Sequence, residues 1–220
     1  PSNPHGSVAS LEYLKKAILL ARKHNFILAL DECYSDIFRL NKPKPPGGLD
    51  AAYHLGANLD NIVIFNSLSK RSNASGMRAG FLVGDEKVID SYKLLVSNGA
   101  SPIPIPIQNV AAALYDDDHH HIKACIHYDE NFAIVEKYLK PFYKDFKIPD
   151  AGFFLWLKVQ NDELAARTLW NEFSLRVMPG TFMAKDINGL NPGRGYLRIS
   201  IVDNAAIVEE AMKRICLFLK

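Results

Sequence analysis

The alternation of amphipathic helices with short apolar runs constrains the fold of this chain most strongly. Ser10 can cap a helix whose apolar residues between positions 11 and 21 recur at spacings of three and four, and positive charge gathers at its C-terminal end. Short apolar runs typical of buried strands follow at residues 26–31, 62–66 and 79–83. This pattern predicts an α/β fold with a mainly parallel sheet covered on both faces, in which sites lie at the carboxyl ends of strands.

A proline-rich segment separates this pattern from the rest of the chain. Pro102, Pro104 and Pro106 interrupt it, and a long helical region through residue 142 follows. Beyond it, apolar strands at 153–159 and 196–201 and a closing helix from Asn204 predict a smaller α+β domain. The expected organisation is therefore residues 1–108 as part of a large domain, and residues 109–220 as an interdomain helix with a small C-terminal domain.

Composition excludes several classes of protein. The 220 residues are 48% hydrophobic and 23% charged, and a formal charge of +2 leaves no basic stripe for nucleic acid. Three widely spaced cysteines, Cys33, Cys125 and Cys216, are typical of reduced thiols and not of a secreted disulfide framework. No apolar run approaches the length of a membrane span. We expect a cytoplasmic protein without membrane or nucleic-acid partners.

The loop after the second apolar run is rich in groups that bind anions. Ser67 and Ser69 supply hydroxyls, Lys70 and Arg78 supply positive charge, and the surrounding glycines let the loop wrap a phosphate. An amine shielded from water can also lose its proton and attack a carbonyl, which is the chemistry of a Schiff-base lysine. Two alternatives remain on this segment alone: an ordinary solvated loop, and a Ser-x-x-Lys acyl-enzyme. The acyl-enzyme needs Ser-Asp-Asn and Lys-Thr-Gly tripeptides, and neither occurs in the chain.

Further motifs accompany this loop. Asp31 and Tyr34 follow the first apolar run, Asn3 opens an Asn-Pro-His-Gly turn, and Arg198 lies inside an apolar strand. The order Asn-Pro-x-Gly, Asp-x-x-Tyr, Ser-x-Ser-Lys, Gly-x-Arg-x-Gly, Arg-x-Ser resembles the class I/II, fold-type I aminotransferases, which depend on pyridoxal 5'-phosphate. His5 departs from the threonine or serine that is usual in that turn.

The resemblance implies roles for the residues nearest the cofactor. Lys70 would bind pyridoxal phosphate as a Schiff base and then move the proton between substrate and cofactor. Asp31 would pair with the pyridine nitrogen, and Tyr34 and Asn3 would hydrogen-bond the phenolic oxygen of the ring. No metal is expected, because adjacent residues of the Asp-Asp-Asp-His-His-His run at 116–121 point in different directions on a helix.

The remaining implied roles concern anion binding and partners. Ser67, Ser69 and Arg78 would bind the phosphate, and Arg198 would bind the substrate α-carboxylate, although a buried ion pair is the alternative for that arginine. The partners implied are a small amino acid and a 2-oxo acid, with a homodimer expected for the full-length protein. The resemblance covers only the later part of a family member, so we expect a fragment that is inactive by itself.

Five stretches together resemble the succinyldiaminopimelate aminotransferases of lysine biosynthesis. They are Gly47–Leu49, Ser67–Asn73, Asp150–Phe153, Met178–Phe182 and Asn191–Gly193, of which the tetrapeptide Lys70-Arg71-Ser72-Asn73 and the tripeptide Asn191-Pro192-Gly193 are the more particular matches. An aspartate or broad-specificity aminotransferase of the same class is the alternative. Arg71 and Arg194 lie near the predicted site loops, where they would meet a distal carboxylate of the substrate, but a solvated surface position is the expectation for each.

Overall fold

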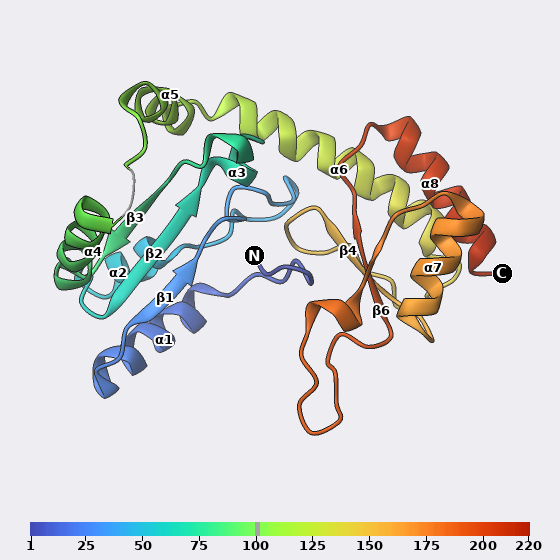
Figure 1. The fold of residues 1–220 in the computed structure, drawn as a ribbon, viewed down its shortest axis with the longest axis horizontal. Helices are drawn as coiled ribbons and strands as arrows, with labels where there is room; N and C mark the ends of the chain where they lie inside the picture. The colour runs from blue at the N-terminus through green and yellow to red at the C-terminus, as the bar shows by residue number, and fades with distance from the viewer. Residues whose placement is uncertain (100–101) are drawn as a thin grey trace. The chain divides into compact units, whose positions relative to one another are not determined.

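The computed structural model describes residues 1–99 and 102–220 (Figure 1). The chain divides into two compact units, the first made of Pro1 with Val8–Ala124 and the second of Ser2–Ser7 with Cys125–Lys220. Each unit has its own three-stranded sheet. The predicted domain boundary between residues 108 and 109 stays a prediction. Within the described residues, no helix is both long and apolar enough to cross a membrane.

The sheet of the first unit has the order β1-β2-β3 (Figure 1). Its strands are β1 (Leu28–Asp31), β2 (Ile62–Ser67) and β3 (Gly80–Gly84). The first two strands run parallel, with Asp31 opposite Phe65, whereas β3 is antiparallel to β2. The α/β class is therefore confirmed, but β3 departs from the parallel expectation. Between β2 and β3 the chain forms only the short helices α3 (Leu68–Arg71) and η1 (Ser75–Met77), and neither is long enough to return the chain along β2 as the crossover helix of a parallel pair does.

Two helices cover one face of this sheet. Helix α1 (Leu11–His24) begins as predicted, since the Ser10 side chain accepts a hydrogen bond from Tyr13 N. It packs with α2 (Gly48–His54) over the two parallel strands. The buried residues of this core are Leu14, Ile18, Ala51, Ala52, Ile62 and Ile64. This packing leaves the carboxyl ends of β1 and β2 at one edge of the sheet, where the predicted site residues begin.

The long helical region predicted through residue 142 is divided in the structure. Helix α4 (Glu86–Gly99) follows β3, and then come α5 (Ile105–Asp116) and α6 (His119–Leu139). The break falls at two consecutive aspartates, because Asp117 is extended and its carboxylate accepts a hydrogen bond from His119 N at 2.8 Å. Of the described residues in α4 and α5, none is buried.

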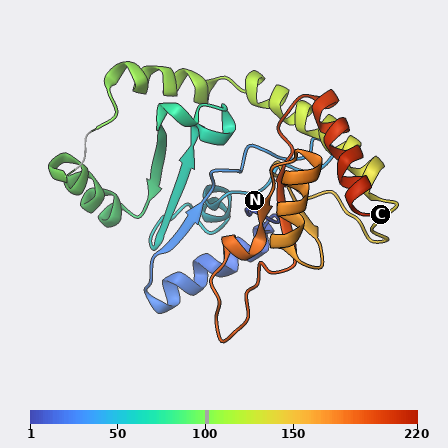
Figure 2. The same ribbon diagram turned by 45° about the vertical axis from the view of Figure 1, so that its right-hand side comes forward.

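The second unit is an antiparallel sheet with helices packed on one face (Figure 2). Its strands have the order β4-β6-β5, with β4 (Phe154–Lys158), β5 (Met178–Pro179) and β6 (Tyr196–Ser200). Its helices are α7 (Asp162–Phe173), η2 (Gly180–Met183) and α8 (Ala205–Phe218), together with the second half of α6. Leu155, Leu157, Leu197 and Ile199 face these helices. Period-two alternation therefore places Trp156 and Arg198 on the opposite face.

Candidate active site

The loop that begins at Asp31 and the helix that carries Lys70 meet at the carboxyl end of the parallel strand pair. Asp31 ends β1, and its Oδ1 accepts a hydrogen bond from Cys33 N at 3.0 Å, which starts a turn carrying Tyr34. The Nζ of Lys70 lies 5.6 Å from the centroid of the Tyr34 ring. Burial, and then the hydrogen bond with Asp31, raise the pKa of Cys33 to about 11, so this thiol stays protonated at neutral pH. The amine of Lys70, in α3, is therefore the candidate nucleophile at this end of the sheet.

The three predicted phosphate ligands lie around the start of α3. Ser67 is the extended residue before this helix, and its Oγ accepts a hydrogen bond from Ser69 N at 3.1 Å and lies 2.9 Å from Ser69 Oγ. Leu68 N donates to the Ala79 carbonyl at 3.1 Å, which draws the segment carrying Arg78 against this turn. Arg78 is exposed, with a left-handed backbone at φ 53°. Two hydroxyls and one guanidinium are thus gathered on one loop.

Arg198 occupies the central strand of the sheet in the second unit. Its guanidinium lies 4.4 Å from the centroid of the Phe154 ring and donates a hydrogen bond to Asn3 Oδ1 at 3.2 Å. Trp156 on β4 and Met178 on β5 flank it in register. Across residues 1–99 and 102–220, no carboxylate is paired with Arg198, so the alternative of a buried ion pair is not what the structure shows. A half-buried guanidinium with most of its donors unused suits an anionic ligand.

The predicted site residues are therefore distributed over both units. Six lie in the first unit: Asp31, Tyr34, Ser67, Ser69, Lys70 and Arg78. Asn3 and Arg198 lie together in the second unit. The first unit therefore holds the residues predicted to bind the cofactor apart from Asn3, and the second holds Asn3 together with the arginine predicted to bind the substrate carboxylate.

Arg71 differs from its expected surface position. Its side chain is only 6% exposed and is paired with Asp36 and Asp118, so the surface prediction was wrong for this residue. Arg194 is exposed, as expected. Nothing in the sequence near Arg71 indicated that Asp36 would be its partner. The acidic run at 116–118 is the sequence signal that could have indicated a partner for Arg71, because it supplies the carboxylate of Asp118.

The histidine and aspartate run does not form a metal centre. Among the described residues, no group of three or more histidine, cysteine, aspartate or glutamate side chains is placed to hold a metal ion. Instead His120 Nδ1 lies 3.0 Å from Asp117 Oδ2, and its Nε2 lies 2.7 Å from the hydroxyl of Ser72. The run therefore joins the segment after α5 to the segment after α3 through hydrogen bonds.

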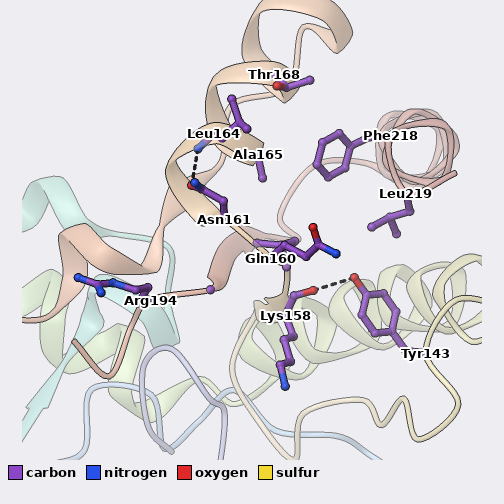
Figure 3. A pocket seen from close by; sticks show the side chains of 12 residues that line it. Tyr143, Lys158, Gln160, Asn161, Leu164, Ala165, Thr168, Arg194, Phe218 and Leu219 are labelled. Atoms are coloured by element: carbon purple, nitrogen blue, oxygen red, sulfur yellow. Dashed lines mark hydrogen bonds between the residues drawn. The ribbon is translucent and has the colours of Figure 1, made fainter. Parts of the chain in front are cut away.

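A separate hollow of about 920 Å³ lies in the second unit (Figure 3). Leu164 and Ala165 of α7 and Phe218 and Leu219 from the end of α8 form its apolar walls. The Tyr143 hydroxyl donates to the carbonyl of Lys158 at 2.9 Å along its lower edge. The hollow contains none of the predicted site residues, and its cations, Lys158 and Arg194, are both exposed on its rim.

The donor set of the first unit fits pyridoxal phosphate. An amine suits its aldehyde, a carboxylate suits its basic ring nitrogen, a phenol suits its ring oxygen, and two hydroxyls with a guanidinium suit its phosphate. Lys70, Asp31 and Tyr34 supply the first three from neighbouring loops of one sheet edge. A parallel strand pair with a lysine and an aspartate at its carboxyl end is best matched by the class of pyridoxal-phosphate enzymes.

Comparison with known proteins identifies the family. The family model described as aminotransferase class I and II matches residues 1–215, so the chain belongs to that family, whose members use pyridoxal 5'-phosphate. A solved aminotransferase from Neisseria meningitidis is 40% identical, with a TM-score of 0.90 over 99% of this chain and 56% of that one. The chain spans about half the length of the relatives it matches.

Relatives with named substrates differ among themselves. An LL-diaminopimelate aminotransferase of Natranaerobius thermophilus is 28% identical over 98% of this chain and 54% of its own length. An aspartate aminotransferase of Thermotoga maritima is also 28% identical, over 98% of this chain and 53% of its own length. A structure described as a probable N-succinyldiaminopimelate aminotransferase from Thermus thermophilus is 26% identical, with a TM-score of 0.84 over 99% of this chain and 56% of that one.

Proposed function

We propose that the complete protein is a pyridoxal-phosphate-dependent transaminase that moves an amino group between glutamate or 2-oxoglutarate and a second amino or keto acid. The observation that carries the proposal is the position of Lys70, whose amine lies over the ring of Tyr34, on the loop that follows Asp31 at the end of a parallel strand pair. Family membership supports the same reaction class. When bound, pyridoxal phosphate supplies an electron sink for the carbanion formed at the substrate α-carbon.

Each residue near the cofactor has a defined task in this proposal. The amine of Lys70 would bind the cofactor covalently. Once the substrate has displaced this amine, the amine would take the proton from the substrate α-carbon and deliver that proton to C4′ of the cofactor. The carboxylate of Asp31 keeps the ring nitrogen protonated. Tyr34 and Asn3 would hydrogen-bond the phenolic oxygen of the cofactor and so lower the basicity of the Lys70 nitrogen when it is bonded to the cofactor.

Two anion sites complete the proposal. Ser67, Ser69 and Arg78 hold the phosphate, and the planar fork of Arg78 supplies charge-assisted hydrogen bonds. Arg198 binds the α-carboxylate of the substrate, and the hydrogen bond to Asn3 and the Phe154 ring orient its guanidinium. A homodimer is proposed for the full-length protein, on the resemblance to the family alone.

The proposed substrate is N-succinyl-2-amino-6-ketopimelate, with glutamate as the amino donor. The support is the Lys70-Arg71-Ser72-Asn73 tetrapeptide, the Asn191-Pro192-Gly193 tripeptide, and the named substrates of the diaminopimelate relatives. Aspartate or broad-specificity transamination is the second candidate, because an aspartate aminotransferase matches the chain at the same identity.

Transamination by the complete protein tests the reaction class. We expect glutamate-dependent formation of 2-oxoglutarate with an added keto acid, and loss of nearly all of it in the Lys70→Ala variant. Lys140→Ala is the matched control, because that lysine is exposed in the second unit and pairs with Glu136. Retention of most activity in Lys70→Ala would contradict the proposal. A penicillin-derived adduct on Ser67 would instead support a Ser-x-x-Lys acyl-enzyme.

A further inference from the structure

Arg71, the residue after Lys70, has its guanidinium buried among hydrogen-bond acceptors. Arg71 Nη2 donates to Asp118 Oδ1 at 2.7 Å and to the carbonyls of Tyr115 and Asp117 at 3.2 and 3.4 Å. Arg71 also lies over the Tyr115 ring, 5.8 Å from its centroid. Asp118 itself is largely exposed, so this side of the network is open to water.

The other side of the network faces the loop after β1. Arg71 Nη1 lies 3.3 Å from Asp36 Oδ1 and 3.0 Å from His121 Nδ1. An arginine can only donate, so His121 accepts at Nδ1 and carries its proton on Nε2. Burial, and then the charge of Arg71, lower the pKa of His121, which agrees with this neutral state. Lys44 Nζ lies 3.3 Å from the same oxygen of Asp36, so Arg71 and Lys44 both pair with that carboxylate.

This network connects two loops that carry the proposed cofactor ligands. Asp36 lies two residues beyond Tyr34, on the loop that begins at Asp31. Arg71 is the residue directly after Lys70 and ends helix α3. The ion pair between Asp36 and Arg71 therefore joins the Asp31–Asp36 loop to the helix of Lys70, close to the point where Lys70 lies over the Tyr34 ring.

Stability alone is a poor explanation for this arrangement. Burying a guanidinium and a carboxylate removes both ions from water at a large cost before their attraction is counted, and well-packed apolar residues in place of a buried pair are often neutral or stabilising. The Nε of Arg71 is also buried without a hydrogen-bond partner among the described residues. A buried pair of this kind is better suited to fixing one geometry between two loops than to adding stability.

We propose that Arg71 is a positioning residue that, through Asp36, holds the amine of Lys70 in register with the Asp31–Tyr34 loop. The inference rests on the proposed function, since it concerns the binding of pyridoxal phosphate by that loop and helix. Arg71 does not contact substrate in this account; it acts through its neighbour Lys70. The side chain of Arg71 is thereby assigned to the cofactor end of the site, and not to the end that would meet a distal carboxylate of the substrate.

The test uses the complete protein loaded with pyridoxal phosphate. The variants are Arg71→Met, which removes the charge, and Asp36→Asn, which keeps the size of the side chain. Arg22→Met is the matched control, because Arg22 donates to the backbone carbonyls of Asn58 and Asp60 in the same unit. The readouts are the dissociation constant for pyridoxal phosphate and the pH titration of the visible absorption of the bound cofactor, neither of which depends on turnover.

We expect Arg71→Met to raise the dissociation constant at least about tenfold, which corresponds to about 1.4 kcal/mol, and to move the midpoint of the absorption titration. Asp36→Asn should change both readouts in the same direction, and the double variant should add little to Arg71→Met, because the two residues act as one pair. Arg22→Met should leave both readouts at the wild-type values.

Two results would overturn the inference. One is an unchanged absorption titration together with a dissociation constant within about twofold of the wild-type value, which is a difference below about 0.5 kcal/mol. This result would have to hold for Asp36→Asn and for Arg71→Met where that variant folds. A loss of thermal stability with both readouts unchanged would show a structural role only. Asp36→Asn decides the matter if Arg71→Met does not fold. If the wild-type protein does not bind pyridoxal phosphate on Lys70, the proposed function itself fails. If the wild-type protein binds it and the variants bind it equally well, only the inference about Arg71 fails.

Discussion

Replacing Asp162 should destabilise the second unit more than any exposed substitution. Asp162 is 1% exposed, and its carboxylate connects η2 to the turn before β6, since Oδ2 accepts from Thr181 N at 2.7 Å and Oδ1 accepts from Gly195 N at 3.0 Å. In Asp162→Asn the amide oxygen still accepts from one of the two backbone donors, Thr181 N or Gly195 N, but the amide N–H faces the other donor and cannot accept from it. Because a hydrogen bond to a charged group contributes about 1.5–3 kcal/mol, losing one and weakening the second should cost about 3 kcal/mol.

The assay is amide hydrogen exchange in the complete protein. The peptides covering 179–183 and 193–197 should lose protection in Asp162→Asn, and the free energy of opening of this unit should fall by about 3 kcal/mol. Glu163→Gln is the matched control, because its exposed neighbouring carboxylate should change stability by no more than about 0.5 kcal/mol. Unchanged protection of Thr181 and Gly195 in Asp162→Asn would refute the reasoning.

The same carboxylate makes the unit sensitive to acid. Burial on its own raises the pKa of Asp162, but the hydrogen bonds from Gly195 and Thr181 outweigh it and leave the pKa below the usual 3.8. The folded state therefore releases this proton more readily than the unfolded state. The stabilisation is complete above the unfolded pKa and is lost as the pH falls through the folded value.

The remaining predictions concern substrate binding and the buried histidine. Arg198→Ala should weaken amino-acid and keto-acid binding by about 1.5–3 kcal/mol while cofactor absorbance survives; loss of cofactor with unchanged substrate affinity would show that Arg198 has been misassigned. In steady-state assays with glutamate, the specificity constant for N-succinyl-2-amino-6-ketopimelate should far exceed that for oxaloacetate, because a short substrate leaves buried polar groups unpaired; equal use of oxaloacetate would leave only a general class I aminotransferase. Because the pKa of His121 is lowered in the folded state, its stabilisation is complete above the usual value of 6.5 and declines as the pH falls below it. A thermal-unfolding series from about pH 7.5 to pH 5 should show this decline and its weakening in His121→Gln; an identical decline in the variant would contradict the assignment.

The elements with strong local signals could be predicted from the sequence. The helix after Ser10 and the closing helix after Asn204 both begin with the side-chain caps that their sequences indicate. Asp31 and Ser67 end their strands at one sheet edge, because parallel pairing follows from the long connection that contains α2. These features depend on neighbouring residues, and local periodicity is enough to find them.

Features set by distant parts of the chain were not predictable. The direction of β3 is set by its pairing with β2 in the folded sheet, and an apolar run alone does not show direction. Arg71 belongs to a segment rich in polar residues that reads as a solvated loop, and its burial arises because α5 and α6 bring Tyr115 and Asp118 over it. Such pairings depend on the tertiary fold, to which sequence periodicity is blind.

Borohydride reduction of the complete protein with pyridoxal phosphate, followed by peptide mass spectrometry, tests the central claim most directly. The account predicts loss of the visible absorption and one phosphopyridoxyl group on Lys70, absent from the Lys70→Ala variant. A label confined to other lysines, or equal labelling of wild-type protein and Lys70→Ala, would contradict the assignment of Lys70 as the residue that binds the cofactor.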